Sequence, residues 1–428
     1  MRRKIRGCAL SLAVLCVLAL SCSGKKILPE AEHYKLIHRI FLQPVDHAHP
    51  DGPTLEQHVD ILLPDGAPTD APVFFHLGNE GDIGEEDLVA LYRLHGARRD
   101  IIYVQAEHRG YGQSLTKDED QSVPSYVRLE QALADAHCII RELKKEYPGP
   151  WMAAGWSYGG GLVINFAARY PDDVEVILSS SGVVDWPFMN YSYERRVKAL
   201  MGDACHARLV EHMKNLEPQE MFDTNWRERE FLLSVIVGLT QYEEYEKLVP
   251  LFKLMSRLST GTFLSVLHAM DERYGSDGRM YSVALSTRKL SRDEAITGRY
   301  NWRVWRYQQC AEVGVFFASE NGEGRLVRQS RDDFCEECKA LFGEAPAYAD
   351  GPEWSPRAML ELLEVPLIYV AGGEDPWFAV GLERGYRIKS GKYFYVSQAR
   401  HCPDREDPEL AQEVLVEMLK HALAGESS

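Results

Sequence analysis

The sequence predicts an α/β protein with a doubly wound, mostly parallel sheet and a helical block inserted into it. Strand-like apolar runs alternate with amphipathic stretches over residues 35–186, as they do when helices cover both faces of a parallel sheet. Within this part, a serine stands in a glycine-rich turn between a strand-like run and a helix-like stretch, where such sheets often carry a reactive side chain.

The spacing of apolar residues predicts the elements in order. Runs of branched and aromatic side chains predict strands at 59–63, 73–77, 101–106, 151–154, 176–180, 365–371 and 392–396. Amphipathic stretches predict helices at 130–146 and 161–170.

A different pattern fills the middle of the chain. Helical spacing dominates, and strand-like runs are few, from residue 187 to about 353; the clearest helices are at 227–239, 242–258 and 262–272. We therefore expect one elaborated domain with a first sheet segment at 35–186, a helical cap at 187–353 and a second sheet segment at 354–428. Such caps exclude large substrates and help to form a binding pocket.

The turn Gly155-Trp156-Ser157-Tyr158-Gly159-Gly160 joins a strand to a helix. Side chains at Gly155 or Gly159 would collide with the neighbouring backbone, so the serine needs small residues on both sides. Its hydroxyl would lie at a helix N-terminus, which stabilises negative charge. This suits acyl transfer, whose tetrahedral intermediate carries an oxyanion. A solvated serine in an ordinary turn is the alternative that the motif alone leaves open.

An acid and a histidine follow the serine along the chain. Asp375 lies in the loop after one late strand and His401 in the loop after the next, so the order is Ser157, Asp375, His401. This is the order in α/β-hydrolases. Alone, Asp375 could be a turn residue and His401 a surface histidine, and Glu374 is a rival acid. Together, the three predict a catalytic triad in an α/β-hydrolase fold, with the helical cap inserted between the nucleophile and the triad acid.

Donors for an oxyanion are expected at the end of the strand at 73–77. The turn Gly78-Asn79-Glu80-Gly81-Asp82 contains glycines that let backbone N–H groups approach a substrate carbonyl. We expect one donor from Gly78, Asn79 or Glu80, and a second from the backbone N–H of Tyr158. An ordinary Gly/Asn turn is the alternative.

Several motifs together give the chain a resemblance to a known family. They are Gly78-Asn79-Glu80-Gly81-Asp82-Ile83, Glu107-His108-Arg109 with Tyr111-Gly112-Gln113-Ser114, Gly155-x-Ser157-Tyr158-Gly159-Gly160, Tyr307-Gln308-x-Cys310-x-Glu312-x-Gly314 and Asp375-Pro376-Trp377. They resemble the serine peptidase family that holds lysosomal Pro-X carboxypeptidase and dipeptidyl peptidase II, over about residues 41 to 401. The secreted bacterial tripeptidyl aminopeptidases are similar in the same motifs. The chain departs from the family's pattern at Trp156 and around His401, in Arg400 and Cys402.

The resemblance implies that Ser157 is the nucleophile, Asp375 the residue that orients the base, and His401 the base. It also implies cleavage next to proline near a peptide terminus. Glu107 and Arg109 are expected to form a structural ion pair at a strand end rather than to act in catalysis.

An aromatic slot would recognise proline, whose ring is flat and rigid and whose nitrogen donates no hydrogen bond. The candidates for this slot are Trp302, Trp305, Tyr307 and Trp377. Any one of them could instead belong to the core of the cap. The acids Glu80 and Asp82 are candidates for binding a substrate's free amine, as in an aminopeptidase. Glu80 could instead only brace the oxyanion loop.

These features together predict an exported serine exopeptidase that cleaves short proline-containing peptides through an acyl-enzyme and releases di- or tripeptides from the N-terminus. A Pro-X carboxypeptidase is one alternative, an esterase or lipase on the same fold is another, and a catalytically inactive surface binding protein is a third. The expected chemistry needs no metal or organic cofactor. The oligomeric state stays open, with a homodimer as one candidate.

Composition agrees with a secreted globular enzyme. Hydrophobic residues make up 45% of the chain and charged residues 26%, which is typical of globular proteins. The formal net charge of −16 disfavours nucleic acid and anionic membranes as partners and could favour cationic peptides.

The first 22 residues are expected to be a leader. Arg2, Arg3, Lys4 and Arg6 form a positive start, and the apolar stretch at 8–20 is too short to span a bilayer comfortably. Ala19-Leu20-Ser21-Cys22 resembles a bacterial lipobox, which predicts lipidation at Cys22 and a membrane-anchored lipoprotein. Simple cleavage to a periplasmic or secreted protein is the alternative.

The cysteines beyond the leader form an even set, as expected for disulfides in an exported protein. They are Cys138, Cys205, Cys310, Cys335, Cys338 and Cys402. The resemblance implies that Cys310 pairs with Cys335 or Cys338. Cys138 lies in an expected helix, where we expect a buried thiol.

Overall fold

An eight-stranded sheet lies at the centre of the fold, in the order β1-β2-β4-β3-β5-β6-β9-β10. Strand β2 runs antiparallel to β4, whereas the pairings from β4 across to β10 are all parallel. This is the sheet of an α/β-hydrolase fold, so the predicted fold class is confirmed. The computed structural model describes residues 33–186, 188–190, 192–274, 289–296, 301–317, 326, 331–343 and 355–424.

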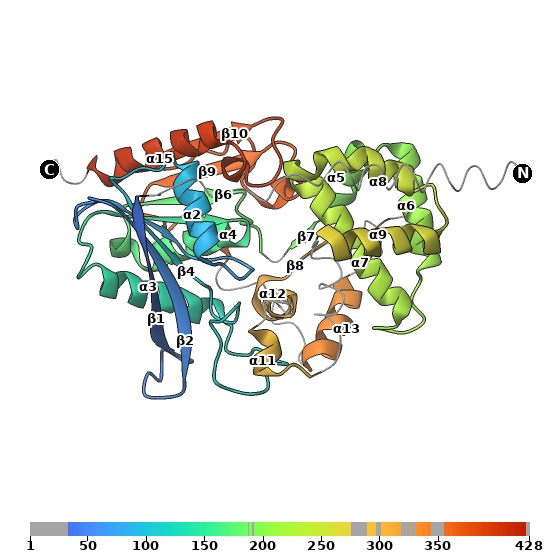
Figure 1. The fold of residues 1–428 in the computed structure, drawn as a ribbon, viewed down its shortest axis with the longest axis horizontal. Helices are drawn as coiled ribbons and strands as arrows, with labels where there is room; N and C mark the ends of the chain where they lie inside the picture. The colour runs from blue at the N-terminus through green and yellow to red at the C-terminus, as the bar shows by residue number, and fades with distance from the viewer. Residues whose placement is uncertain are drawn as a thin grey trace, which may run out of the picture. The chain divides into compact units, whose positions relative to one another are not determined.

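The sheet is made of long and short strands, with helices on both faces (Figure 1). The strands are β1 (Tyr34–Pro44), β2 (Thr54–Pro64), β3 (Val73–His76), β4 (Ile102–Ala106), β5 (Trp151–Trp156), β6 (Val176–Ser180), β9 (Leu367–Gly372) and β10 (Gly391–Val396). The covering helices are α2 (Glu85–Leu94), α3 (Leu129–Leu143), α4 (Tyr158–Arg169), α14 (Pro356–Met359) and α15 (Pro408–Ala422). Helix α2 packs beside α15, and α3 packs beside α4.

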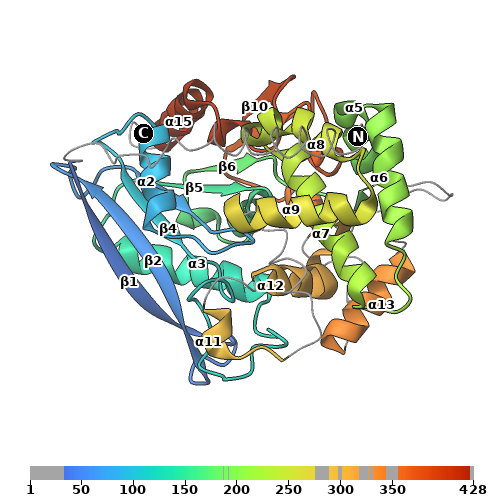
Figure 2. The same cartoon turned by 45° about the vertical axis from the view of Figure 1, so that its right-hand side comes forward.

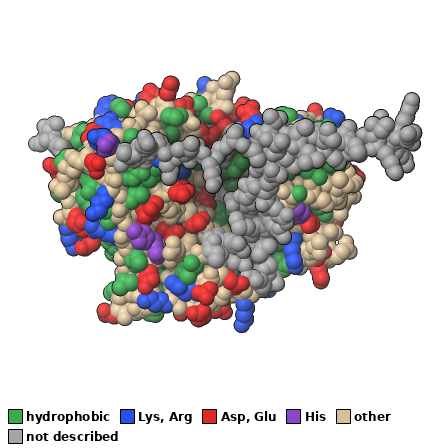
Figure 3. Space-filling model, viewed as in Figure 1, with side chains coloured by type: hydrophobic (Ala, Val, Ile, Leu, Met, Phe, Trp, Pro, Cys, Tyr) green, Lys and Arg blue, Asp and Glu red, His purple; other side chains and the backbone are tan. Residues whose placement is uncertain are grey.

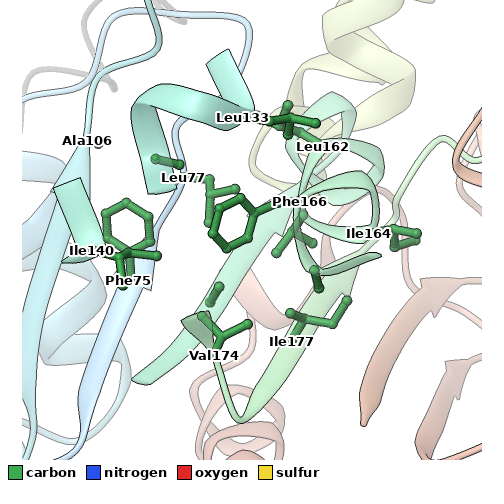
Figure 4. Close-up of a cluster of buried hydrophobic side chains, with 14 of the residues drawn as sticks. Phe75, Leu77, Ala106, Leu133, Ile140, Leu162, Ile164, Phe166, Val174 and Ile177 are labelled. Atoms are coloured by element: carbon green, nitrogen blue, oxygen red, sulfur yellow. The ribbon is translucent and has the colours of Figure 1, made fainter. Parts of the chain in front are cut away.

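Successive side chains of β3 point to opposite faces of the sheet. Phe75 belongs to the buried cluster that also contains Ile140 of α3 and Leu162 and Phe166 of α4 (Figure 4). Its neighbour Phe74 faces the other way, with its ring 4.9 Å from that of His95, directly after α2. Burying such a side chain stabilises the fold by roughly 1.5–3 kcal/mol, so the strand is held from both sides.

Between β6 and β9 the chain is mainly helical. The described elements are β7 (Phe188–Asn190), α5 (Ser192–Met201), α6 (Asp203–Asn215), α7 (Thr224–Gln241), η2 (Glu243–Leu248), α8 (Val249–Met255), α9 (Thr260–Tyr274), α11 (Arg292–Ala295), α12 (Asn301–Gln308), the π-helical turn η3 (Gln309–Val313), β8 (Val315–Phe317) and α13 (Arg331–Phe342). We call α5 to α13 the cap. Its residue limits stay a prediction.

The cap has a hydrophobic core of its own. Leu209, Phe231, Phe252 and Phe263 form one buried cluster. They come from α6, α7, α8 and α9, whose ribbons Figure 2 shows. The helix expected at 242–258 is divided into a 3₁₀ turn and α8. Pro250 stands in the first turn of α8, where its missing N–H costs no helical hydrogen bond, so a new helix begins there.

The disulfide in the cap joins Cys310 to Cys338 rather than to Cys335. It links η3 to α13 and so closes a loop of the cap.

Cys138 is exposed on α3, so the expected buried thiol is wrong. Its neighbours Ala136 and Ile139 occupy the buried side of the helix instead.

Acidic and basic side chains are interspersed on the face that Figure 3 shows. No helix within the described ranges is both long enough and apolar enough to cross a membrane. The predicted leader, including Cys22, lies outside the described residues.

Candidate active site

Ser157 occupies the tight turn between β5 and α4. Its backbone has φ 56° and ψ −122°, which is a strained conformation for a residue with a side chain. A Cβ at Gly155 would collide with the carbonyl oxygen of Gly159, and a Cβ at Gly159 would lie 2.8 Å from the carbonyl oxygen of Gly78. The N–H of Ser157 donates to Ser180 O at 2.9 Å, which fixes the turn at the carboxyl edge of the sheet.

His401 and Asp375 form a buried pair. Nδ1 of His401 lies 2.7 Å from Oδ2 of Asp375, while Oδ1 of Asp375 accepts from the N–H of Trp377 at 2.8 Å. Because Nδ1 is engaged with the carboxylate, Nε2 is the nitrogen that can accept a proton. Nε2 is buried and has no hydrogen-bond partner. The rival acid Glu374 forms an ion pair with Arg196 of the cap instead.

The loops that carry these side chains meet at one edge of the sheet. Strands β5, β6, β9 and β10 are successive parallel neighbours, so their carboxyl ends lie together. A Cβ at Gly372, the last residue of β9, would collide with Arg400 O. The N–H of Cys402 donates to Oγ of Ser181 at 2.8 Å. The histidine loop therefore lies directly over the ends of β6 and β9.

Opposing effects act on the pKa of His401. Burial lowers the pKa of His401, but the charge of Asp375, the neighbouring Cys402 and the hydrogen bond to Asp375 together outweigh burial and raise the pKa well above 6.5. An imidazole with a raised pKa is a stronger base, and it becomes neutral only at higher pH.

Glu80 lies beside the candidate nucleophile. Its carboxyl interacts with the Ser157 hydroxyl and is close enough to His401 to be affected by its charge, which brings the three residues together. Burial raises the pKa of Glu80. Its Oε2 is buried and has no hydrogen-bond partner. Such an atom is costly unless another group pairs with it, which is what a ligand would do.

The turn after β3 packs closely against the start of α4. Gly78 has φ 82°, and a Cβ there would lie 2.6 Å from Ala106 O, so only glycine fits. Asn79 is half-buried in the same turn. Tyr158 is the first residue of α4, where backbone N–H groups have no acceptor inside the helix. The predicted oxyanion donors thus come from segments that touch each other.

Trp305 and Trp377 lie near this site, whereas Tyr307 does not. The ring of Trp305 is 5.2 Å from that of Tyr158, which also stacks on Trp186 at 5.8 Å. Trp377 directly follows the Asp375 turn, and its Nε1 donates to Oε1 of Gln241 at 3.2 Å.

Tyr307 instead packs in a buried cap cluster with Trp226, Phe334 and Phe342. The sequence could not separate it from Trp305, because both stand on one aromatic-rich helix and only their faces differ. Trp302 is half-buried on that helix, three residues before Trp305.

The end of α7 contacts the loop of His401, and through Trp377 it also contacts the loop of Asp375. The N–H of His401 donates to Gln241 O at 3.2 Å, and the Arg400 guanidinium donates to Tyr242 O at 2.9 Å. A cation at a helix C-terminus is favourable, because the last carbonyl groups carry partial negative charge. Nothing in the sequence indicated that Gln241 belongs to the site, since a glutamine at a helix end is common.

Asp82 and the motif Glu107-His108-Arg109 hold separate segments of the chain together. Oδ1 of Asp82 accepts from Asn301 at 2.7 Å, which joins the turn after β3 to α12. Arg109 pairs with buried Asp135 at 2.6 Å, not with Glu107, so the expected Glu107–Arg109 ion pair is wrong. Glu107 instead accepts from Ser114 N at 2.9 Å. Glu107 and Arg109 are close in sequence but have different partners after the end of β4, and the sequence could not show this.

Comparison with known proteins agrees with this geometry. A family model described as serine carboxypeptidase S28 matches residues 65–247. Thymus-specific serine protease of Mus musculus is 24% identical over 397 residues, which cover 78% of this chain and 75% of the relative. Lysosomal Pro-X carboxypeptidase of Mus musculus is 34% identical over 169 residues, which cover 36% of this chain and 33% of the relative.

The chain is a serine peptidase related to family S28. The resemblance that its motifs predicted is thereby confirmed. The peptidase also resembles prolyl tri/tetrapeptidyl aminopeptidase of Streptomyces mobaraensis, with 30% identity over 158 residues that cover 36% of this chain and 31% of the relative. A solved proline iminopeptidase of Mycobacterium smegmatis is 14% identical and aligns over 90% of this peptidase and 100% of its own chain, with a TM-score of 0.41.

The family match contains the turn after β3 and Ser157 but ends before Asp375 and His401. Catalytic roles for Asp375 and His401 are therefore a proposal that rests on their buried hydrogen bond.

Proposed function

We propose that this protein is an exported serine exopeptidase that cleaves short peptides next to proline and releases di- or tripeptides from the N-terminus. Nε2 of His401 takes the proton of Ser157 as its oxygen attacks the substrate carbonyl, and Asp375 holds the imidazolium that forms. The oxyanion accepts from the N–H of Tyr158 and from one N–H of the Gly78–Glu80 turn. His401 returns the proton to the leaving amine, and water then hydrolyses the acyl-enzyme.

The buried, unpaired carboxyl oxygen of Glu80 supports the aminopeptidase direction. A substrate ammonium would supply Oε2 with the charged partner that it lacks. A carboxypeptidase would instead need a cation for the substrate's C-terminal carboxylate. Glu80, which interacts with Ser157, is an acid, and an acid favours binding of an amine.

The carboxylates also agree with the proposed product length. One residue spans at most about 3.6 Å, so the amine lies at most roughly 7 Å from the attacked carbonyl in a dipeptide and at most roughly 11 Å in a tripeptide. Glu80 contacts Ser157, and the exposed Asp82 lies up to about 7 Å further along the same turn. The two acids together cover the positions that such an amine can reach.

Aromatic rings next to Ser157 support the preference for proline. Trp305 and Trp186 each contact the ring of Tyr158, the residue that follows the nucleophile. A flat pyrrolidine ring packs well on aromatic faces and leaves no unmet donor there. The names of two relatives, a Pro-X carboxypeptidase and a prolyl tri/tetrapeptidyl aminopeptidase, point to the same substrate class.

A panel of chromogenic peptides tests this function. We expect cleavage of Ala-Pro and Ala-Ala-Pro anilides with a free amine, and strong loss of kcat/KM when the amine is acetylated. Alanine in place of proline should lower kcat/KM by about 10–200-fold, the usual discrimination of an apolar pocket. Asp82→Asn should raise KM for free-amine substrates about tenfold and leave the acetylated ones unchanged, whereas Glu80→Gln, next to Ser157, should slow both classes but the free-amine substrates more.

Other outcomes assign other functions. Cleavage of a C-terminal residue after proline that is lost on amidation of that end would make the protein a carboxypeptidase. Faster hydrolysis of long-chain esters than of any peptide would make it an esterase.

We propose further that Cys22 carries a lipid that anchors the exported protein to a membrane. The disulfide between Cys310 and Cys338 supports an oxidising compartment. Cys22→Ser should move the protein from the membrane pellet to the supernatant after cell fractionation, because acyl chains supply the anchoring energy. A wild-type protein that is already soluble, with its mature N-terminus at another residue, would contradict the anchor. A homodimer stays a prediction.

A further inference from the structure

Gln308 is a fully buried polar residue of α12 that reaches two tyrosines outside the cap. Its Nε2 donates to the Tyr158 hydroxyl at 2.9 Å, and its Oε1 accepts from the Tyr111 hydroxyl. The exposed fractions are 0% for Gln308, 1% for Tyr158 and 0% for Tyr111. The proposed reaction uses none of these side-chain contacts, although Gln308 belongs to one of the motifs shared with the family.

The direction of the hydrogen bonds follows from His108. Its Nδ1 lies 2.8 Å from Arg109 O and so donates to that carbonyl. Burial lowers the pKa of His108 to about 4, so the ring is neutral near pH 7 and Nε2 is an acceptor. Nε2 faces the Tyr158 hydroxyl at 3.5 Å. The chain therefore runs one way, from Tyr111 through Gln308 and Tyr158 to His108.

The chain ends on the residue that follows the nucleophile. Tyr158 begins α4, and its backbone N–H is the proposed oxyanion donor. Its ring touches Trp305, which precedes Gln308 by one turn on α12. Helix α12 thus holds Tyr158 by a hydrogen bond and by a ring contact. Oxyanion donors lose much of their effect when they are misplaced by a fraction of an ångström, so the fixing of this residue matters for rate.

We propose that Gln308 is a positioning residue for the oxyanion donor of Tyr158, so that the seating of cap helix α12 sets the rate of the chemical step. The inference rests on the proposed roles of Ser157 and Tyr158. It predicts that loss of the Gln308 donor lowers kcat and leaves KM nearly unchanged, because the oxyanion forms only in the transition state.

The test compares Gln308→Met, Gln308→Glu and Tyr158→Phe on the best peptide of the panel. Gln308→Met and Tyr158→Phe should each lower kcat about tenfold, with KM within about twofold of wild type. The double variant should be no slower than the slower single variant, because both remove the same hydrogen bond. If its loss equals the product of the two single losses, the coupling is absent and the inference is wrong.

Gln308→Glu supplies a readout that a purely structural role would not change. A protonated glutamic acid still donates to Tyr158, whereas a carboxylate can only accept from the Tyr158 hydroxyl, which then no longer donates to His108. Burial raises the pKa of native Glu312, four residues further along, to about 7, so this variant should titrate in a measurable range. Its kcat relative to wild type should approach one at acid pH and fall about tenfold at alkaline pH.

Gln43→Glu is the matched control, because Gln43 is a buried glutamine that bonds to Gln57 instead. Its kcat relative to wild type should not vary with pH in this way. Thermal melting shows whether each variant folds; if Gln308→Met does not, Tyr158→Phe and Tyr111→Phe carry the test. Unchanged kcat in variants whose Ser157 still reacts with a fluorophosphonate would overturn this inference alone. A wild-type Ser157 that does not react would overturn the proposed function.

Discussion

Ser157→Ala is expected to abolish labelling by a fluorophosphonate and to lower kcat by about 10⁴–10⁶. The nucleophile forms the covalent acyl-enzyme, and this variant removes the hydroxyl that the strained turn after β5 presents. The measurement is active-site labelling followed by peptide mapping, together with single-turnover kinetics on an Ala-Pro anilide. Residual hydrolysis would come from binding and from the oxyanion donors.

A serine in the cap provides the control for this result. Ser265 is exposed on α9, where its hydroxyl only donates to Gly261 O at 2.8 Å. Ser265→Ala should keep full labelling and full activity. Complete labelling of Ser157→Ala at some other serine would show that the turn after β5 does not carry the nucleophile.

Asp375→Asn is expected to lower kcat by about 10⁴, because the amide cannot hold the imidazole in the tautomer that leaves Nε2 free to accept a proton. The pH dependence should change as well. In the wild type, kcat/KM should fall as the pH drops through a value above 6.5, since Asp375 raises the pKa of His401 and only the neutral imidazole is a base. Removing the negative charge should move this acid limb to lower pH.

Glu374→Gln is the matched control for Asp375→Asn. Glu374 precedes Asp375 in the same loop but pairs with Arg196, so its loss should change kcat by less than about tenfold and leave the acid limb in place. A large loss at Glu374 with a small loss at Asp375 would reverse the assignment of the acid.

The sheet could be predicted because its signal is local. Buried parallel strands are short apolar runs, and those predicted at 73–77, 151–154 and 176–180 correspond to β3, β5 and β6 within a few residues. The chain order of Ser157, Asp375 and His401 was also readable, because each follows such a run directly. The register and the antiparallel β2–β4 pair depend on contacts distant in sequence and were not predicted.

Contacts between side chains of distant segments were the part that the sequence could not predict. Nothing near Gln241 indicates that its carbonyl accepts from the N–H of His401. Arg109 was expected to pair with its near neighbour Glu107, although the buried partner is Asp135 on α3. Tyr307 and Trp305 differ only in the face of α12 that they occupy, and a helix of eight residues has too few apolar positions to show which face is buried.

The hydrogen bond from His401 to the end of α7 has a consequence for how such enzymes can change their substrate. The carbonyl of Gln241 in the cap accepts from the backbone N–H of His401, so a whole cap taken from a relative would hold that N–H at a slightly different position. The recipient enzyme would then gain a new pocket, but Nε2 of His401 would no longer be aligned with Ser157. New specificity in this scaffold should therefore arise more readily by single substitutions in the cap that leave both Gln241 and Gln308 in place than by exchange of the entire cap.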